Sequence, residues 1–98
     1  MAPSVLIVDD ALFMRMMIRD ILSKDGFDVV GEAENGQEAI ERIHSNGIDI
    51  LILDLRLPIL SGLETYLELK RTGHVIPTLI VTAYFEEYAD DVNKLRSL

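Results

Sequence analysis

The chain has 98 residues, 49% of them hydrophobic and only 6% aromatic, a composition that suits one small α/β core packed by aliphatic side chains. A formal net charge of -8 argues against binding to nucleic acid or to an anionic membrane, because both require clusters of Lys and Arg. The sequence contains no cysteine, which excludes a disulfide framework, a thiolate metal site and a cysteine nucleophile. We therefore expect a single domain over residues 1–98.

The first apolar run, Val5 to Val8, predicts a β-strand that is buried on both faces. The run is too short for a signal peptide or a membrane span, and no basic segment precedes it, so we expect a cytoplasmic protein. Two carboxylates, Asp9 and Asp10, follow this strand directly.

The segment from Leu12 to Lys24 predicts an amphipathic helix that ends near Gly26. Arg15 and Arg19 fall on its predicted solvent side. The apolar residues that recur at helical spacing, and that we expect to face the core, are Met14, Met17, Ile18, Ile21 and Leu22.

A weaker strand is predicted from Phe27 to Ala33, and its modest hydrophobicity indicates an edge of the sheet. The Asn35-Gly36 turn then leads into a second helix, which the next Asn-Gly pair ends. The apolar face of that helix consists of Ala39, Ile40 and Ile43.

The run from Ile50 to Leu53 is the most hydrophobic of the predicted strands, which indicates a central position, and Asp54 ends it. After Pro58, Ser61 and Glu64 have the spacing of a capping box and predict the start of a third helix. We expect the inner face of this helix to consist of Leu63, Tyr66 and Leu67, and Gly73 to end it.

A fourth strand is predicted to begin near Pro77, continue through Leu79 to Val81 and end at Thr82. The tail then has apolar residues at spacings of three and four, which predicts a fourth amphipathic helix. These residues are Phe85, Tyr88, Val92, Leu95 and Leu98.

Strands and helices thus alternate, a pattern that predicts a doubly wound α/β fold with a parallel sheet. Ligands of such sheets bind outside the carboxyl ends of the strands, where the strand order reverses. If the first and third strands are neighbours, roughly 4.8 Å apart, then Asp9, Asp10 and Asp54 share one crevice. Three carboxylates this close repel one another and favour a cation. Oxygen ligands without His or Cys favour Mg²⁺ over zinc.

A carboxylate beside Mg²⁺ is suited to attack a phosphorus centre, because the ion screens the repulsion between two anions. Asp54 is the best candidate for this nucleophile, since it alone ends the central strand. Thr82 ends the fourth strand at the same edge, and its hydroxyl is placed to hydrogen-bond a phosphoryl oxygen on Asp54.

Three motifs in the order VLIVDD, DLRLPILSG and LIVTA resemble the receiver domain of two-component response regulators. The stretch DDALFMRMMIRDIL is similar to the chemotaxis-type, CheY-like receivers. The resemblance implies that Asp54 is the phosphoacceptor and that Asp9 and Asp10 are the acidic pair that binds Mg²⁺. It further implies a metal contact from the backbone carbonyl of Arg56 and a switch role for Thr82.

The same resemblance implies a signalling module rather than an enzyme with a separate substrate: phosphotransfer and autodephosphorylation are self-catalysed. The phosphoryl donor is expected to be a phosphohistidine of a sensor histidine kinase or phosphotransfer protein, and a downstream protein partner reads the response. Pro58 and Gly62 match the loop that shapes the family's site, and Arg56 and Tyr84 match positions on its rim.

Receivers have a five-stranded sheet of order 2-1-3-4-5, and we expect only 2-1-3-4 here, without the fifth strand and fifth helix. In the family, the fifth strand presents a lysine to the site. Lys94 does not match that lysine, because it follows Thr82 too soon and lies within the fourth helical pattern. An unpaired fourth strand is an apolar edge, so we expect self-association as a homodimer or by domain swapping.

Three alternatives remain. The first is a phosphorylation-incompetent truncated receiver that acts as an interaction or self-association module. The second is an aspartyl phosphatase of the DxDxT type, which Arg56 disfavours because it stands where a second Asp is required. The third is a flavodoxin-like cofactor binder, disfavoured because no phosphate-binding loop follows the first strand. We expect His44 and His74 to be isolated residues exposed to solvent.

Overall fold

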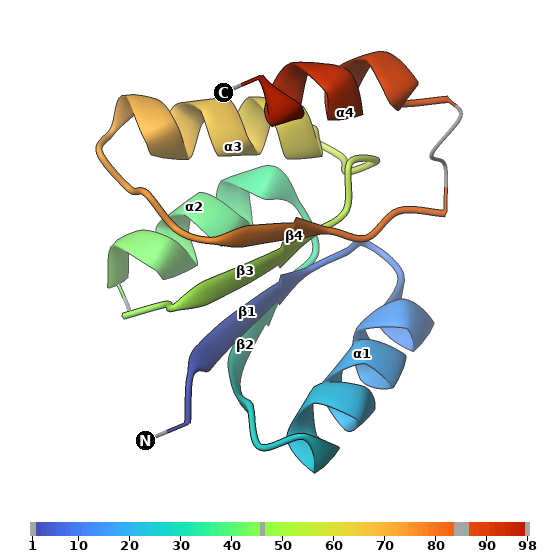
Figure 1. Ribbon diagram of the computed structural model, residues 1–98, viewed down its shortest axis with the longest axis vertical. Helices are drawn as coiled ribbons and strands as arrows, with labels where there is room; N and C mark the ends of the chain where they lie inside the picture. The colour runs from blue at the N-terminus through green and yellow to red at the C-terminus, as the bar shows by residue number, and fades with distance from the viewer. Residues whose placement is uncertain (1, 46, 84–86, 98) are drawn as a thin grey trace.

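Within the described residues, 2–45, 47–83 and 87–97 of a computed structural model, one parallel sheet forms the centre of the fold (Figure 1). Its strands are β1 Ser4–Val8, β2 Asp28–Ala33, β3 Ile50–Leu53 and β4 Thr78–Ile80. Their order is β2-β1-β3-β4, so the strand order reverses between β1 and β3. The predicted doubly wound sheet and its order are confirmed.

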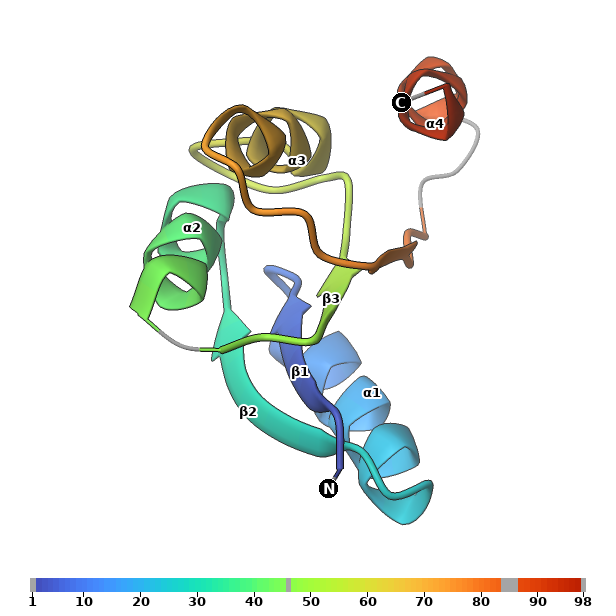
Figure 2. The same cartoon turned by 60° about the vertical axis from the view of Figure 1, so that its left-hand side comes forward.

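Four helices connect or follow these strands in the described parts of the chain: α1 Leu12–Lys24, α2 Gly36–Ser45, α3 Gly62–Arg71 and α4 Ala89–Arg96. α1 covers one face of the sheet, and α2 and α3 cover the other (Figure 2). α4 follows β4 in the chain and lies on the side of the sheet edge that β4 forms (Figure 1). No helix among the described residues is long and apolar enough to cross a membrane.

The core has two layers because successive side chains of a strand point to opposite faces. On one face, Leu6 and Val8 of β1 pack with Leu51 and Leu53 of β3. This layer is completed mainly by α2, through Ala39, Ile40 and Ile43, as the sequence predicts, and by Leu69 of α3. On the other face, Val5, Ile7 and Ile52 pack against Ile18 and Leu22 of α1.

The first three strands and the first three helices lie where the sequence predicts them. β4 is shorter than expected, ending at Ile80 rather than Thr82, and α4 begins at Ala89. Phe85 and Leu98, which the sequence pattern assigned to the fourth helix, and Tyr84 lie outside the described residues.

The predicted faces of α1 are partly wrong. Arg15, expected on the solvent side, is only 6% exposed, whereas Met17 and Ile21, expected to face the core, are 42% and 55% exposed. α1 contacts the sheet through Ile18 and Leu22, a narrower stripe than the apolar pattern suggests. Leu12, Phe13 and Met16 are also exposed, so α1 presents a largely apolar outer surface.

The capping box of α3 is present as predicted. The Ser61 hydroxyl accepts a hydrogen bond from the Glu64 N–H at 3.1 Å, and the Glu64 carboxylate accepts one from the Ser61 N–H at 3.0 Å. The inner face agrees with the prediction only in part, since Tyr66 packs against the core. Thr65 and Leu69 are buried, while the residues expected there are half-buried: Leu63, Tyr66 and Leu67.

Ile59, in the loop between β3 and α3, has a φ of 71°, a left-handed conformation that costs a β-branched residue about 1–2 kcal/mol. Its side chain is exposed, so the strain has no packing compensation. We expect Ile59→Asn to stabilise the chain by about 1 kcal/mol, because Asn tolerates this region. Urea denaturation measures the change. Val75→Asn is the control, since Val75 is exposed without positive φ, and an equal gain there would contradict the backbone explanation.

Candidate functional site

Three carboxylates meet at the carboxyl edge of the two central strands. Val8 of β1 pairs with Leu53 of β3, so Asp9 and Asp54, which follow them, lie side by side. Carboxylate oxygens of Asp9, Asp10 and Asp54 lie within 4.8 Å of one another. The three carboxylates predicted to meet at the ends of the apolar runs therefore lie together.

Backbone hydrogen bonds extend the sheet ladder to the two buried acids. The Asp9 N–H donates to the Ala33 carbonyl at 3.1 Å, and the Asp54 N–H donates to the Val8 carbonyl at 3.0 Å. Their carboxylates also accept local bonds, Asp9 from the Ala11 N–H at 2.9 Å and Asp54 from the Arg56 N–H at 3.3 Å. The carboxylates of Asp9 and Asp54 are thus held by the turns that follow their own strands.

Burial and mutual repulsion disfavour the negative charge of the clustered carboxylates. Asp9 and Asp54 are 5% and 6% exposed, whereas Asp10 is open to solvent. Burial raises the pKa of Asp9, and the charges of Asp54 and Asp10 raise it further, against lowering by the Ala11 N–H and by Arg15. A hard divalent cation would offset this repulsion, and an all-oxygen donor set fits Mg²⁺.

The raised pKa of Asp9 gives a prediction about stability. Asp9→Asn is expected to stabilise the metal-free chain at neutral pH by about 1 kcal/mol, because it removes a buried charge but keeps an acceptor for the Ala11 N–H. As pH falls through the folded-state pKa of Asp9, the native state takes up a proton before the unfolded state does, so the wild type gains stability relative to the variant. The difference should disappear near pH 3.8, the ordinary pKa.

Chemical denaturation in EDTA, repeated across this pH range, tests the expectation. Asp20→Asn is the control, because Asp20 pairs on the surface with Lys24 and lies away from the cluster. A lower stability of Asp9→Asn at neutral pH would contradict it.

Gly62 allows the loop after β3 to fold back onto Asp54. Its N–H donates to the Leu55 carbonyl at 3.0 Å. A Cβ on Gly62 would lie 2.3 Å from the carbonyl oxygen of Asp54 and 2.7 Å from the Cα of Leu55, distances that only glycine permits. The match of Gly62 to a site-shaping loop therefore has a steric reason.

Arg56 and Thr82 lie at the same edge of the sheet. Arg56 is exposed and follows Asp54 by two residues, its N–H bonded to the Asp54 carboxylate. Thr82 lies two residues beyond β4 and is half-buried. It lines a hollow of about 360 Å³ between β4 and α4, together with Thr78, Ile80, Val92, Leu95 and Arg96. Metal binding by the Arg56 carbonyl and phosphoryl binding by Thr82 stay predictions.

The response regulator receiver domain family matches residues 5–96 of the chain. The chain belongs to this family. The chemotaxis protein CheY of Bacillus subtilis is 49% identical over 71 residues, which are 72% of this chain and 59% of that protein. The match thus spans about three fifths of the length of this relative.

A second kind of relative is an enzyme with further sequence. The protein-glutamate methylesterase/protein-glutamine glutaminase of Geobacillus kaustophilus is 40% identical over 88 residues, 89% of this chain but 25% of the enzyme. Receiver domains are signalling modules, and the similarity to this enzyme extends over a quarter of its length.

Solved structures agree with this assignment. The response regulator domain of Thermotoga maritima CheB has a TM-score of 0.85 and 32% identity, over 98% of this chain and 72% of that chain. The CheX-CheY-BeF3-Mg+2 complex of Borrelia burgdorferi has a TM-score of 0.80 and 26% identity, over 94% of this chain and 72% of that chain. The described residues therefore have the receiver fold.

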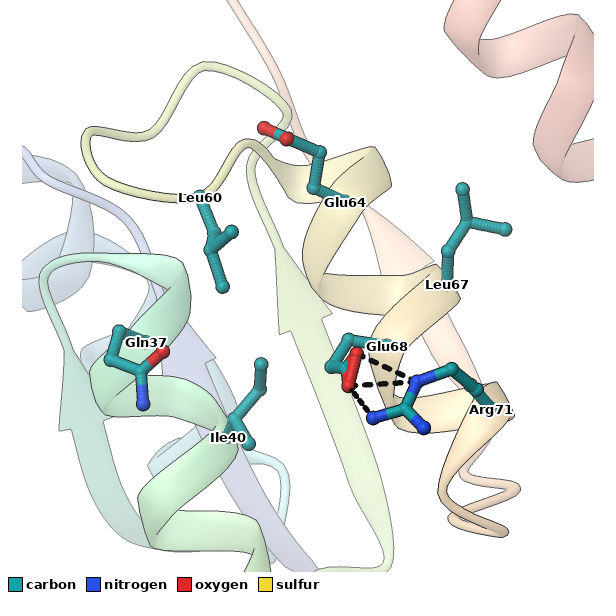
Figure 3. Close-up of a pocket in the computed structure, with 7 residues that line it drawn as sticks. All are labelled: Gln37, Ile40, Leu60, Glu64, Leu67, Glu68 and Arg71. Atoms are coloured by element: carbon teal, nitrogen blue, oxygen red, sulfur yellow. Dashed lines mark hydrogen bonds and ion pairs between the residues drawn. The ribbon is translucent and has the colours of Figure 1, made fainter.

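A hollow of about 610 Å³ lies between α2 and α3 and is not lined by the clustered acids (Figure 3). Its charged groups are already engaged, Glu68 with Arg71 and Glu64 in the capping box of α3. The remaining lining residues are Gln37, Ile40, Leu60 and Leu67. It is a groove between helices, separate from the carboxylate cluster at the strand ends.

Two results were missed by the sequence interpretation of this receiver. His44 and His74, expected to be lone, stack on each other with ring centroids 4.5 Å apart, because the ends of α2 and α3 lie close together. Arg15 is buried beside Asp9, whose backbone oxygen it contacts at 2.6 Å. A sequence signal for Arg15 existed in Glu32 and Glu34, two acids near the end of a strand that neighbours the helix.

Proposed function

We propose that this receiver is the cytoplasmic phosphoacceptor of a two-component system, with Asp54 as the residue phosphorylated. The observation that supports this most is the cluster of Asp9, Asp10 and Asp54, within 4.8 Å at the switch point of the sheet. The donor is a phosphohistidine of a sensor histidine kinase or phosphotransfer protein. A downstream protein partner then reads the phosphorylated state.

The reaction follows from the arrangement of the acids. A carboxylate oxygen of Asp54 attacks the phosphorus, a P–O bond forms, and the P–N bond to the donor histidine breaks with its electron pair left on the imidazole. Asp9, Asp10, Asp54 and the Arg56 carbonyl would hold Mg²⁺, and the bound ion would supply positive charge to offset that of the phosphoryl group. The Arg56 N–H holds the Asp54 carboxylate in place. Water later attacks the phosphorus, the P–O bond to Asp54 breaks, inorganic phosphate leaves, and Asp54 returns to a free carboxylate.

The switch is assigned to Thr82. Its hydroxyl donates a hydrogen bond to a phosphoryl oxygen on Asp54, a contact that exists only in the phosphorylated state. A contact of this kind shifts a conformational equilibrium, because it stabilises one of the two states. Thr82 lies between the site and α4, so its movement would reach the hollow that it lines with Val92 and Leu95.

The test is phosphorylation of the 98-residue chain by a small-molecule phosphodonor, followed by intact mass, with and without Mg²⁺. We expect one phosphoryl group per chain in Mg²⁺, none in EDTA, and none on Asp54→Asn. The matched control Asp20→Asn removes an exposed carboxylate of α1 and should react as the wild type does. A wild type that takes no phosphoryl group, or an Asp54→Asn variant that does, would sink the proposal.

A second candidate is self-association through β4, with or without phosphorylation. β4 is an edge of the sheet among the described residues, and its Leu79 is 58% exposed. Such an edge offers unpaired backbone groups to another chain, as a homodimer or a domain swap. Sedimentation should show a concentration-dependent dimer that Leu79→Lys weakens. A compact monomer at high concentration excludes this candidate and leaves phosphorylation untouched.

A further inference from the structure

Arg15 is a buried charge that the proposed chemistry leaves without a role. Its side chain is 7% exposed, and a guanidinium at such depth is stable only when its donors are satisfied. Nε donates to Glu32 at 2.9 Å, and Nη2 pairs with Glu34 at 3.5 Å. Nη1 donates to the backbone carbonyl oxygen of Asp9 at 2.6 Å. Arg15 therefore links α1, the end of β2 and the acid pair.

Arg19 is a natural comparison on the same helix. It donates to the second oxygen of Glu32 at 2.8 Å, so both arginines share one carboxylate. Arg19 is 42% exposed, and its other hydrogen bond goes to the Val29 carbonyl, well before the strand end. Arg15 differs from Arg19 in its depth and in its contact with Asp9.

The carbonyl that Arg15 contacts belongs to the peptide unit that joins Asp9 to Asp10. The Asp9 N–H is fixed by Ala33 at 3.1 Å, and its carboxylate is fixed by the Ala11 N–H at 2.9 Å. Arg15 fixes the remaining polar group of the residue, its carbonyl. The orientation of this peptide decides the direction in which Asp10 leaves the strand, and so where the two carboxylates meet.

We propose that Arg15 is a positioning residue, which holds the Asp9–Asp10 peptide in the orientation that binds a divalent cation. The inference rests on the proposed Mg²⁺ site. Charge and geometry have opposite consequences here. Removing a positive charge beside a cation site favours the cation electrostatically, whereas releasing the peptide disfavours it.

Three variants separate the two effects by calorimetric titration with Mg²⁺ alone. Arg15→Lys keeps the charge and loses the planar fork, and Arg15→Met loses both but keeps a flexible apolar stem. We expect both to weaken Mg²⁺ binding about tenfold, as for other groups that orient metal ligands. Arg19→Met removes the neighbouring charge without touching Asp9, and its affinity should be equal to the wild type or slightly higher.

A measurement on the wild type complements the variants and does not depend on their folding. Mg²⁺ should shift the Nε–H signal of Arg15 in a ¹H–¹⁵N spectrum more than that of Arg19. The inference is overturned if the Arg15 signal stays still while the Asp10 amide moves, or if folded Arg15→Lys and Arg15→Met bind Mg²⁺ as the wild type does. In that case the phosphoacceptor proposal stands. A wild type that binds no Mg²⁺ overturns both.

Discussion

Gly62→Ala is expected to destabilise the chain by about 3 kcal/mol and to slow phosphorylation of Asp54 as well. The added Cβ would meet two backbone atoms, the Asp54 oxygen at 2.3 Å and the Leu55 Cα at 2.7 Å. Backbone atoms of a buried strand end cannot rotate away as a side chain does, so the loop after β3 has to move. That loop also contains the Arg56 N–H that holds the Asp54 carboxylate. The substitution should therefore lower both the stability of the chain and the rate of phosphorylation.

Urea denaturation and the phosphorylation assay measure the two effects on the same variant. Gly47→Ala is the matched control, since a Cβ at Gly47 meets nothing within 4 Å and its φ is not left-handed. That change is expected to be neutral or to stabilise by about 0.5 kcal/mol, through the unfolded state. If Gly62→Ala is as stable as Gly47→Ala, the close approach of the loop to Asp54 is wrong.

Gly36→Ala is the second change with a large expected effect, also about 3 kcal/mol. Gly36 begins α2 where that helix meets α3, and its Cβ would lie 2.0 Å from the Thr65 hydroxyl and 2.6 Å from the Leu60 carbonyl oxygen. Thr65 has little freedom to turn away, because it is fully buried and its hydroxyl donates to the Ser61 carbonyl at 2.7 Å. The helices should separate, while the acids remain on their strands.

A double-mutant cycle with Thr65→Ala identifies the cause. Removing the hydroxyl relieves the closest of three contacts, so the double variant should recover part of the loss, and the two contacts with Leu60 should retain the rest. Strictly additive losses would contradict a clash between Gly36 and Thr65. Phosphorylation of folded Gly36→Ala should be as fast as that of the wild type, in contrast to Gly62→Ala.

The sequence was informative where one local pattern decides the outcome. Continuous apolar runs end at Val8 and Leu53, and parallel strands place their carboxyl ends together, so Asp9 and Asp54 could be assigned to one crevice. The capping box was found because both of its partners, Ser61 and Glu64, lie within one turn.

The sequence was insufficient where two distant elements decide the outcome. The side of α1 that contains Arg15 looks polar in a helical projection. Glu32 is a candidate partner in the sequence, but its pairing with Arg15 depends on how α1 packs against β2. Met17 and Ile21 are apolar but exposed, because α1 contacts the sheet through Ile18 and Leu22. The role proposed for Thr82 depends on a phosphoryl group, and helical periodicity or strand length says nothing about such a contact.

The position of each strand in the sheet has a consequence for the time scale on which its backbone opens. β1 is paired on both sides and buried from Val5 to Val8. β4 is three residues long and, in the described part of the chain, pairs on one side only, with β3. We expect the amide hydrogens of β1 to exchange with solvent only on global unfolding, and those of β4 to exchange through smaller, more frequent openings. We therefore expect Asp9 and Asp10 to follow a slowly opening strand and Thr82 a faster one. The carboxylates proposed to bind the cation thus follow rigid backbone. Thr82, which is proposed to contact the phosphoryl group, follows a strand that opens more easily.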